Sequence, residues 1–259
     1  MVVHTFAYYK SKNTTAEEEI DVVPDDVLTR TAATRFMIPP GMTKLYWGFA
    51  GGYYLGEARL YTPSLETRKY KLRIIPKNVE NVNISYDYGY VFKPSPPVSF
   101  VATEELSYYA SITNATAARD VVGVFTIGPD ALPPVPPGEP IWVKCTGTTT
   151  LVPFRWTSVK LTPEVQLEAG TYALLNAIAI SPGAIAVRFI IPGLVWRPGF
   201  PAVAAANEYA GLALYRNLKD QVIETEYGRF SHLAIPEAQF LSSSADTSEV
   251  VYLKIVKVA

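Results

Sequence analysis

Two short stretches of the sequence, EARLYTP (residues 57–63) and VRFIIP (residues 187–192), share one design. Each is a run of strand-forming residues with an arginine near its start and a proline at its end. Arg59 and Arg188 are 129 positions apart, and the closing prolines have the same spacing. Because the chain has 259 residues, this distance is half its length, and it indicates an internal repeat in which both halves have the same fold.

The two halves can be aligned at this spacing in three places. Gly41 falls on Gly170 before a buried strand, and the turn GGYYLGE falls on the turn that contains SPG. Near the end of each half, residues 111–127 fall on residues 240–256. Only the start of each half needs a different shift, which places HTFAYYKS on IWVKCTGT. A constant spacing matters because a slip of one residue turns a strand inside out.

Short strands are predicted along the whole chain. Turn residues recur every 8 to 14 positions, and runs such as TKLYWGFA, FRWTSVKL and EVVYLKIVKV are rich in β-branched and aromatic residues. The best helix candidate is the segment 200–220. We therefore expect an all-β protein with about eight strands in each half, which suits two tandem jelly rolls or related Greek-key sandwiches.

A proline-rich segment marks the expected joint between the halves. In GPDALPPVPPGEP, residues 128–140, six of thirteen residues are proline, so this segment cannot enter the interior of a sheet. We expect an N-terminal domain over residues 1–128, a linker over residues 129–140 and a C-terminal domain over residues 141–259.

The composition excludes several functions. The formal net charge is −1 and charges are spread along the chain, which argues against a nucleic-acid partner. Cys145 is the only cysteine, and it is expected to be a buried apolar residue. With two histidines and no nucleophile, phosphate-binding or zinc motif, the sequence predicts no catalytic residue, no metal site and no cofactor.

Aromatic residues provide the candidate binding positions. Tyrosine is abundant, especially in the first half, and aromatic side chains with polar tips suit protein interfaces. Tyr53 and Tyr54 lie in the expected turn of the first half, and Trp196 and Arg197 follow the repeated strand of the second. These four residues are the predicted interface positions, because tryptophan and arginine are common interface anchors.

The repeated stretches resemble a known family. The segments TKLYWGFAGGYYLGEARLYTP and LEAGTYALLNAIAISPGAIAVRFIIPGLVWRPG are similar to major capsid proteins of tailless icosahedral bacterial and archaeal viruses. The resemblance implies a double jelly-roll chain that forms pseudo-hexagonal homotrimers, tiles a capsid in the virion, and contacts minor capsid or vertex proteins. This sequence has neither a clear amphipathic N-terminal helix nor a basic arm, which leaves contact with a membrane open.

Two other functions stay open at this point. One is a glycan-binding or adhesive tandem β-sandwich, such as a spike or lectin-like module. The other is an enzyme on a β-sandwich, for which Glu224 and Glu226 are the available carboxylate pair. We expect a structural protein and no enzyme, because no site context surrounds this pair.

Overall fold

A computed structural model describes the chain except for residues 1–2, 25–29, 68–71, 75–76, 79–90 and 216–222. The chain forms two compact units. Unit 1 holds Phe6–Asp130, and unit 2 holds Ala131–Ala259 together with residues 3–5. The division falls inside the proline-rich segment 129–140. The first residues of the chain cluster with unit 2, whereas the sequence placed all of residues 1–128 in one domain.

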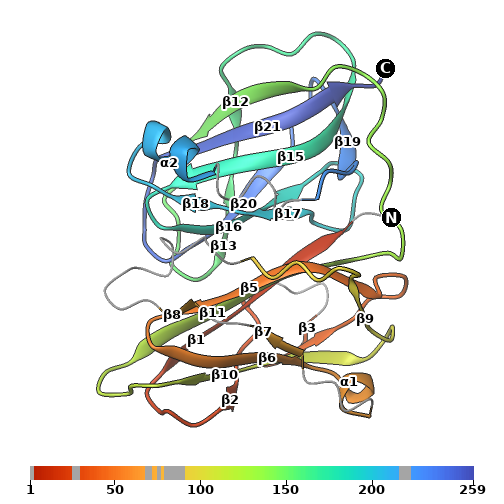
Figure 1. The fold of residues 1–259 in the computed structure, drawn as a ribbon. Coiled ribbons are helices and arrows are strands. Elements are labelled where there is room, and N and C mark those ends of the chain that lie inside the picture. Colours follow the sequence, from red (N-terminus) through yellow and green to blue (C-terminus); the bar gives the residue numbers. More distant parts are fainter. Residues whose placement is uncertain (1–2, 25–29, 68–71, 75–76, 79–90, 216–222) are drawn as a thin grey trace. The chain divides into compact units, whose positions relative to one another are not determined.

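The described residues of unit 1 form two sheets and one short helix, α1 (Pro63–Thr67) (Figure 1). The first sheet has the order β1-β11-β5-β8, with β9 also on β5, and the second has the order β3-β4-β10-β6-β7, with β2 also on β10. The strands are β1 (His4–Lys12), β2 (Glu18–Glu19), β3 (Arg30–Ala32), β4 (Arg35–Met37), β5 (Lys44–Gly52), β6 (Leu55–Tyr61), β7 (Leu72–Ile74), β8 (Lys77–Asn78), β9 (Val98–Ser99), β10 (Glu105–Ile112) and β11 (Arg119–Gly128).

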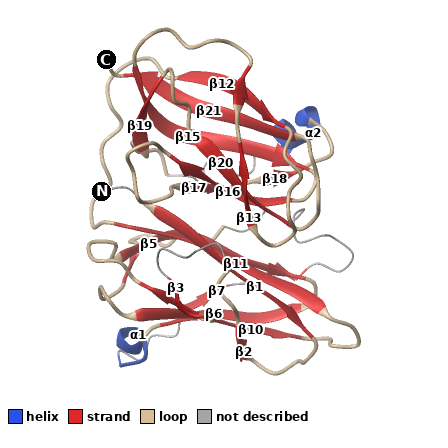
Figure 2. Ribbon diagram, turned by 180° about the vertical axis from the view of Figure 1, so that it is seen from behind, coloured by secondary structure: helices blue, strands red, loops and turns tan. Residues whose placement is uncertain are grey.

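Outside residues 216–222, unit 2 also forms two sheets and one helix, α2 (Glu208–Tyr215) (Figure 2). Its sheets have the orders β14-β12-β21-β15-β18, with β19 also on β15, and β13-β20-β16-β17. The strands are β12 (Ile141–Gly147), β13 (Trp156–Val159), β14 (Thr162–Pro163), β15 (Thr171–Ser181), β16 (Ala184–Ile190), β17 (Gly199–Pro201), β18 (Val203–Ala204), β19 (Gly228–Ser231), β20 (Glu237–Ser242) and β21 (Glu249–Lys257).

Both units arrange their main strands in the same order. The eight main strands of unit 1 are β1, β4, β5, β6, β7, β9, β10 and β11, and those of unit 2 are β12, β13, β15, β16, β17, β19, β20 and β21. Numbered one to eight along the chain, the strands of one sheet have the order 1-8-3-6 and those of the other 2-7-4-5 in both units. The agreement extends to direction. β5 pairs in parallel with β8 and antiparallel with β9, just as β15 pairs in parallel with β18 and antiparallel with β19. The prediction of an all-β chain is confirmed, and the two halves have corresponding ladders.

The central hairpin of each unit keeps the predicted spacing. β6 and β16 are both seven residues long and start 129 positions apart, and β5 and β15 end 129 positions apart. The two-residue turn Tyr53–Tyr54 therefore corresponds to Pro182–Gly183. This agreement is expected for a hairpin, because a two-residue turn fixes the register of the two strands that it joins.

The third part of the predicted repeat is wrong by one residue. Gly123 of β11 pairs with Ala50. Ala179, which lies 129 positions after Ala50, pairs with Val251. Val251 thus corresponds to Gly123, whereas the alignment of residues 111–127 with 240–256 placed it on Val122.

A compensating shift in the preceding strand explains this error. Tyr108 pairs with Leu60, while Ala238 pairs with Phe189, which is 129 positions after Leu60. The spacing is therefore 130 at β10 and β20 and 128 at β11 and β21. One spacing is a residue longer than 129 and the other a residue shorter, so the two shifts cancel. An alignment of the two halves without gaps therefore shows no break.

An aromatic cluster joins the two sheets of unit 1. Phe125 of β11 lies 5.5 Å from the Tyr108 ring of β10, and Phe6 stacks at 3.8 Å on Phe36 of β4. Glycine leaves room for these rings, because a Cβ at Gly48 would come within 2.3 Å of the Phe125 side chain. The core of unit 1 is thus closed by large rings that pack between the sheets.

The segment 200–220 differs from the predicted helix. It contains the end of β17, then β18, and only eight residues of helix in α2, while residues 216–222 lie outside the described part. Val203 and Ala204 are buried and pair with β15. Edge pairing and burial outweigh the helix propensity of the alanines, which is a weak preference.

We expect Phe125→Ala to destabilise unit 1 by about 3–5 kcal/mol, because it removes a fully buried ring that contacts several others. Denaturant unfolding followed by tyrosine and tryptophan fluorescence measures this change. Val101→Ala is the control, since Val101 is 51% exposed and its loss should cost less than about 0.5 kcal/mol. Equal effects of the two substitutions would contradict this account of the core.

Candidate interface residues and their surroundings

Tyr53 and Tyr54 form the turn between β5 and β6. Their rings meet edge to face, with centroids 4.3 Å apart, and Tyr54 has a φ of 60°. A left-handed conformation is unusual for a large side chain and stores strain in the turn. The sequence correctly placed both residues in a turn, and the structure adds that both are partly exposed.

Arg119 completes this aromatic pair and was missed in the sequence. Its guanidinium lies 4.8 Å from the Tyr53 ring centroid and 4.9 Å from that of Tyr54. Its Nε is buried and has no hydrogen-bond partner among the described residues. A cation over two rings is favourable, more so where it is shielded from water. The ladder register brings Arg119 here, and no local motif could have shown it.

Trp196 and Arg197 lie in unit 2, before β17. The Trp196 ring is 5.7 Å from the His4 ring. The Arg197 guanidinium donates a hydrogen bond to the side-chain oxygen of Gln239 at 2.9 Å, and its carbonyl accepts the Thr5 N–H at 2.9 Å. Both residues are partly buried, and each is engaged with its own chain.

The predicted interface residues therefore form two pairs rather than one group. Tyr53 and Tyr54 belong to unit 1, and Trp196 and Arg197 belong to unit 2. The tyrosines contact Arg119, and Arg197 contacts Gln239, in each case within one unit. They remain predictions as interface positions.

Arg188, from the opening stretch, is fully buried in unit 2. Its Nε donates to the Gln239 side chain at 2.9 Å, one Nη donates to the Thr5 carbonyl at 3.1 Å, and the guanidinium lies 4.2 Å from the Trp156 ring centroid. A buried cation is tolerated only when such groups replace water. Arg188 thus ties the first residues of the chain to β16, β20 and β13.

Arg59, its counterpart in unit 1, has a different environment. It pairs with Glu17 through two hydrogen bonds of 2.5 and 2.9 Å and lies 4.5 Å over the Tyr109 ring. Arg59 stays partly exposed, and Tyr109 stands opposite it on β10 as Gln239 stands opposite Arg188 on β20. The same position therefore serves a surface ion pair in one unit and a buried network in the other.

The histidines and the cysteine are held in structural roles. Burial, followed by the charges of Arg188 and Arg197, keeps the pKa of His4 well below its ordinary value. His232 lies at the main chain of Gly170. Burial raises the pKa of the Cys145 thiol to about 12, so the thiol stays protonated at neutral pH.

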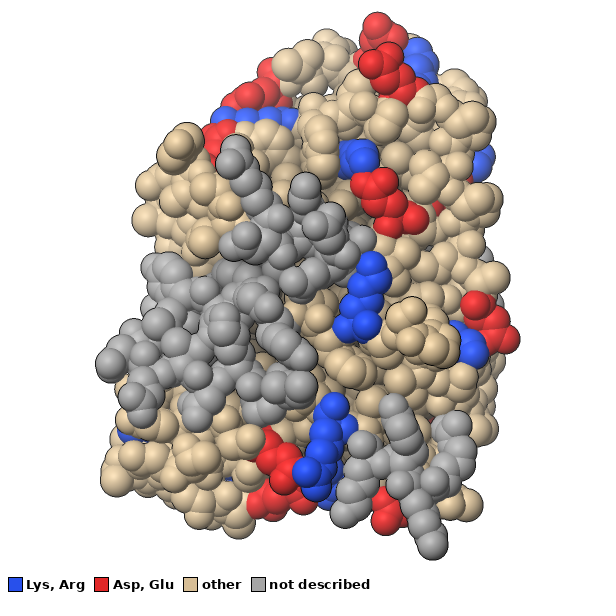
Figure 3. All heavy atoms as spheres, in the orientation of Figure 1, with Lys and Arg blue, Asp and Glu red and all other residues tan. Residues whose placement is uncertain are grey.

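The carboxylate pair considered for an enzyme is divided between two cations. Glu224 pairs with Lys254, while Glu226 accepts hydrogen bonds from Arg229 at 2.7 and 3.0 Å. In the described part of the chain, no group of three or more metal-binding side chains comes together. No described helix is long and apolar enough to cross a membrane. On the face shown in Figure 3, acidic and basic side chains are interspersed.

Glu249, at the start of β21, is a buried acid at the end of unit 2. The residue is 1% exposed, its Oε2 accepts the Thr149 N–H at 3.3 Å, and its Oε1 has no hydrogen-bond partner among the described residues. Burial, helped by the nearby Asp246, raises its pKa to about 7. The side chain is therefore partly protonated near neutral pH.

Comparisons with known proteins add little. No family model matches the chain, and a search of curated proteins found no match. Among solved structures, a Paenibacillus xanthan lyase matches 99% of this chain but only 25% of its own length, with a TM-score of 0.27 and 11% identity. The major capsid protein P2 of bacteriophage PM2 matches over 99% of this chain and 98% of its own, with a TM-score of 0.20 and 11% identity. Structural similarities with TM-scores and identities this low support no inference about the fold or the function of this chain.

We expect Arg188→Lys to lower the free energy of unfolding of unit 2 by about 1–3 kcal/mol. Lysine replaces the planar fork, whose separate nitrogens reach Gln239 and the Thr5 carbonyl, with a single ammonium group, and it loses the planar stacking on Trp156. Chemical denaturation measures the change, with the exposed Arg73→Lys as the matched control. A loss no larger than that of the control would show that the network is not stabilising.

Glu249 should make stability depend on pH. Because its folded pKa of about 7 lies above the ordinary 4.5, the folded state binds the proton more tightly than the unfolded chain. This stabilisation is complete below pH 4.5 and is lost as the pH rises through 7. Glu249→Gln should therefore match the wild type near pH 4.5 and melt at a higher temperature than the wild type at pH 8. The exposed Glu168→Gln is the control, and parallel melting profiles for wild type and Glu249→Gln would refute the assignment.

Proposed function

We propose that the protein is a structural capsid protein whose two units are jelly rolls. The observation that carries this proposal is the strand order 1-8-3-6 and 2-7-4-5, present twice in one chain. A jelly roll is an eight-stranded sandwich of two Greek keys, and this order joins the first and last strands as neighbours in one sheet. Such a rigid sandwich leaves its loops and edges for contacts with other molecules.

A doubled sandwich suits a shell for a reason of symmetry. Three chains with two similar units each present six similar outlines, so a closed threefold ring acquires a nearly sixfold shape. Rings of this shape fill a surface with few gaps. The resemblance of the two repeated stretches to capsid proteins of tailless icosahedral viruses agrees with this proposal. We accordingly propose homotrimers in a virion, with minor capsid or vertex proteins as further partners.

The proposal assigns no catalytic step. The available carboxylates Glu224 and Glu226 each serve an ion pair, and the Cys145 thiol is held protonated by burial. Arg188, the most deeply buried cation described above, is committed to neutral protein groups. These side chains support the structure of their own unit.

The direct test is electron microscopy of the purified full-length chain, combined with its mass by light scattering. We expect trimers of pseudo-hexagonal outline that form sheets or shells at higher protein concentration. A monomer at all concentrations that binds immobilised glycans would overturn the capsid proposal and favour an adhesive module. Turnover of a polysaccharide by the purified chain would overturn the non-enzymatic part.

A further inference from the structure

In the described part of the chain, strand β12 has no partner strand along part of its outer edge. It pairs with β21 along its whole length, from Ile141 to Gly147, but with β14 only at Cys145 and Thr146. Beyond these positions, the Lys144 carbonyl accepts the Glu164 N–H at 2.9 Å. Along the described chain, no strand pairs with the outer edge of β12 before Lys144.

Alternation along the strand shows which groups face this edge. Since the Lys144 carbonyl points away from β21, the N–H and carbonyl of Trp142, two residues earlier, point the same way. Within the described residues, neither group has a hydrogen-bond partner. Ile141 and Trp142 are each 45% exposed, which is high for large apolar side chains in a strand.

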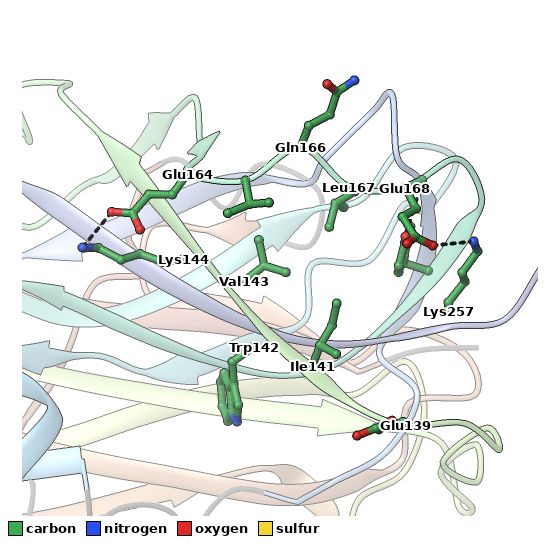
Figure 4. A pocket seen from close by; sticks show the side chains of 12 residues that line it. Glu139, Ile141, Trp142, Val143, Lys144, Glu164, Gln166, Leu167, Glu168 and Lys257 are labelled. Carbon is green, nitrogen blue, oxygen red and sulfur yellow. Dashed lines mark hydrogen bonds and ion pairs between the residues drawn. The ribbon is translucent and has the colours of Figure 1, made fainter.

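A preformed slot lies beside this edge. The segment from Glu164 to Glu168 runs alongside β12 and is fixed at both ends. Glu164 is held by Lys144 at 2.8 Å, and Glu168 is held by the Tyr172 hydroxyl at its carbonyl and by Lys257 at its carboxylate. Between the edge and the segment is a cavity of about 700 Å³. In Figure 4, apolar side chains from both sides face it.

Both lysines that line the slot are already paired with carboxylates, and Glu139 adds a further carboxylate to the lining. Lys144 pairs with Glu164 and also with Glu208 at 2.8 Å, and Lys257 pairs with Glu168 at 3.2 Å. An anionic ligand would have to displace these pairs. What the slot offers a partner is a main-chain donor and acceptor together with an apolar surface, which is what an added β-strand uses.

Strand β1, which corresponds to β12, shows what covers such an edge. Along β1, the edge-facing residues Thr5, Ala7 and Tyr9 all have main-chain partners. The Thr5 N–H donates to the Arg197 carbonyl, the Ala7 carbonyl accepts the Val23 N–H, and the Tyr9 N–H donates to the Asp21 carbonyl.

The corresponding positions in β12 are Trp142, Lys144 and Thr146, because both Ala7 and Lys144 accept from the crossing segment. Lys144 and Thr146 have partners, whereas Trp142, the counterpart of Thr5, has none among the residues that the structure describes. At the equivalent place in β1, the partner is main chain of this same protein.

We propose that an extended main-chain segment of a second copy of this chain pairs with the edge of β12 at Trp142. This inference rests on the proposed function, because a threefold ring needs a contact between unlike surfaces of neighbouring copies. The free edge supplies one of those surfaces. The apolar side chains of the slot and the paired lysines favour protein main chain over an anionic ligand.

The test compares two substitutions of one residue in the full-length chain. Trp142→Pro removes the edge-facing N–H, which the fold of unit 2 does not use, whereas Trp142→Thr keeps that N–H and removes the same ring. Light scattering and sedimentation measure mass against protein concentration. We expect Trp142→Pro to weaken self-association at least about tenfold more than Trp142→Thr, since it removes a donor and obstructs the added strand.

A second variant keeps the inference testable if the proline disturbs folding. Val165→Glu places a charge on the flank of the slot at a residue that is 72% exposed, so the fold should tolerate it. It should weaken association as well, while Val195→Glu, at a 62% exposed residue elsewhere in unit 2, should not. Thermal melting of each variant confirms that it is folded.

The outcomes separate this inference from the proposed function. If wild type and all variants form the same trimers, the edge inference is overturned and the capsid proposal stands. If wild type forms only dimers, and Trp142→Pro abolishes them while Trp142→Thr does not, the edge inference stands and the threefold shell is overturned. A wild type that stays monomeric at every concentration overturns both.

Discussion

Main-chain hydrogen bonding between neighbouring strands fixes which side chains face the space between two sheets, and the rest of this protein follows from that register. Gly123 must stand opposite Ala50 for Phe125 to reach the aromatic cluster of unit 1. The same ladders place Arg59 opposite Tyr109 and set the environment of its counterpart in unit 2. Core, surface ion pairs and buried cations are therefore all consequences of one pairing pattern.

Sequence reasoning was most successful inside single hairpins. The spacing of 129 residues holds for β5 with β15 and for β6 with β16, because a two-residue turn leaves no freedom to slip. It failed where a loop separates the paired strands, since a loop can gain or lose residues without disturbing either core. The helix expected over residues 200–220 failed for another reason, because burial against β15 outweighed local propensity.

The surroundings of the candidate residues were less predictable than the fold. Arg119 stands 65 positions after Tyr54, and only the completed ladder brings its guanidinium to the two rings. Glu249 looks like any surface acid in the sequence, yet it begins a strand at an inward-facing position and loses its contact with water. The consecutive Ile141 and Trp142 were a readable signal, because two large apolar residues in a row break the alternation of an edge strand.

The contacts of Thr5 have a consequence for biosynthesis. Its carbonyl accepts a hydrogen bond from the Arg188 side chain, and its N–H donates to the Arg197 carbonyl, so both partners leave the ribosome almost two hundred positions later. At typical elongation rates of about 5–20 residues per second, this interval is roughly 10 to 40 seconds. During that time these two contacts of Thr5 cannot form, although β1 can already pair with β11. A bulky group placed close to Thr5 would therefore interfere with a late step in the folding of unit 2.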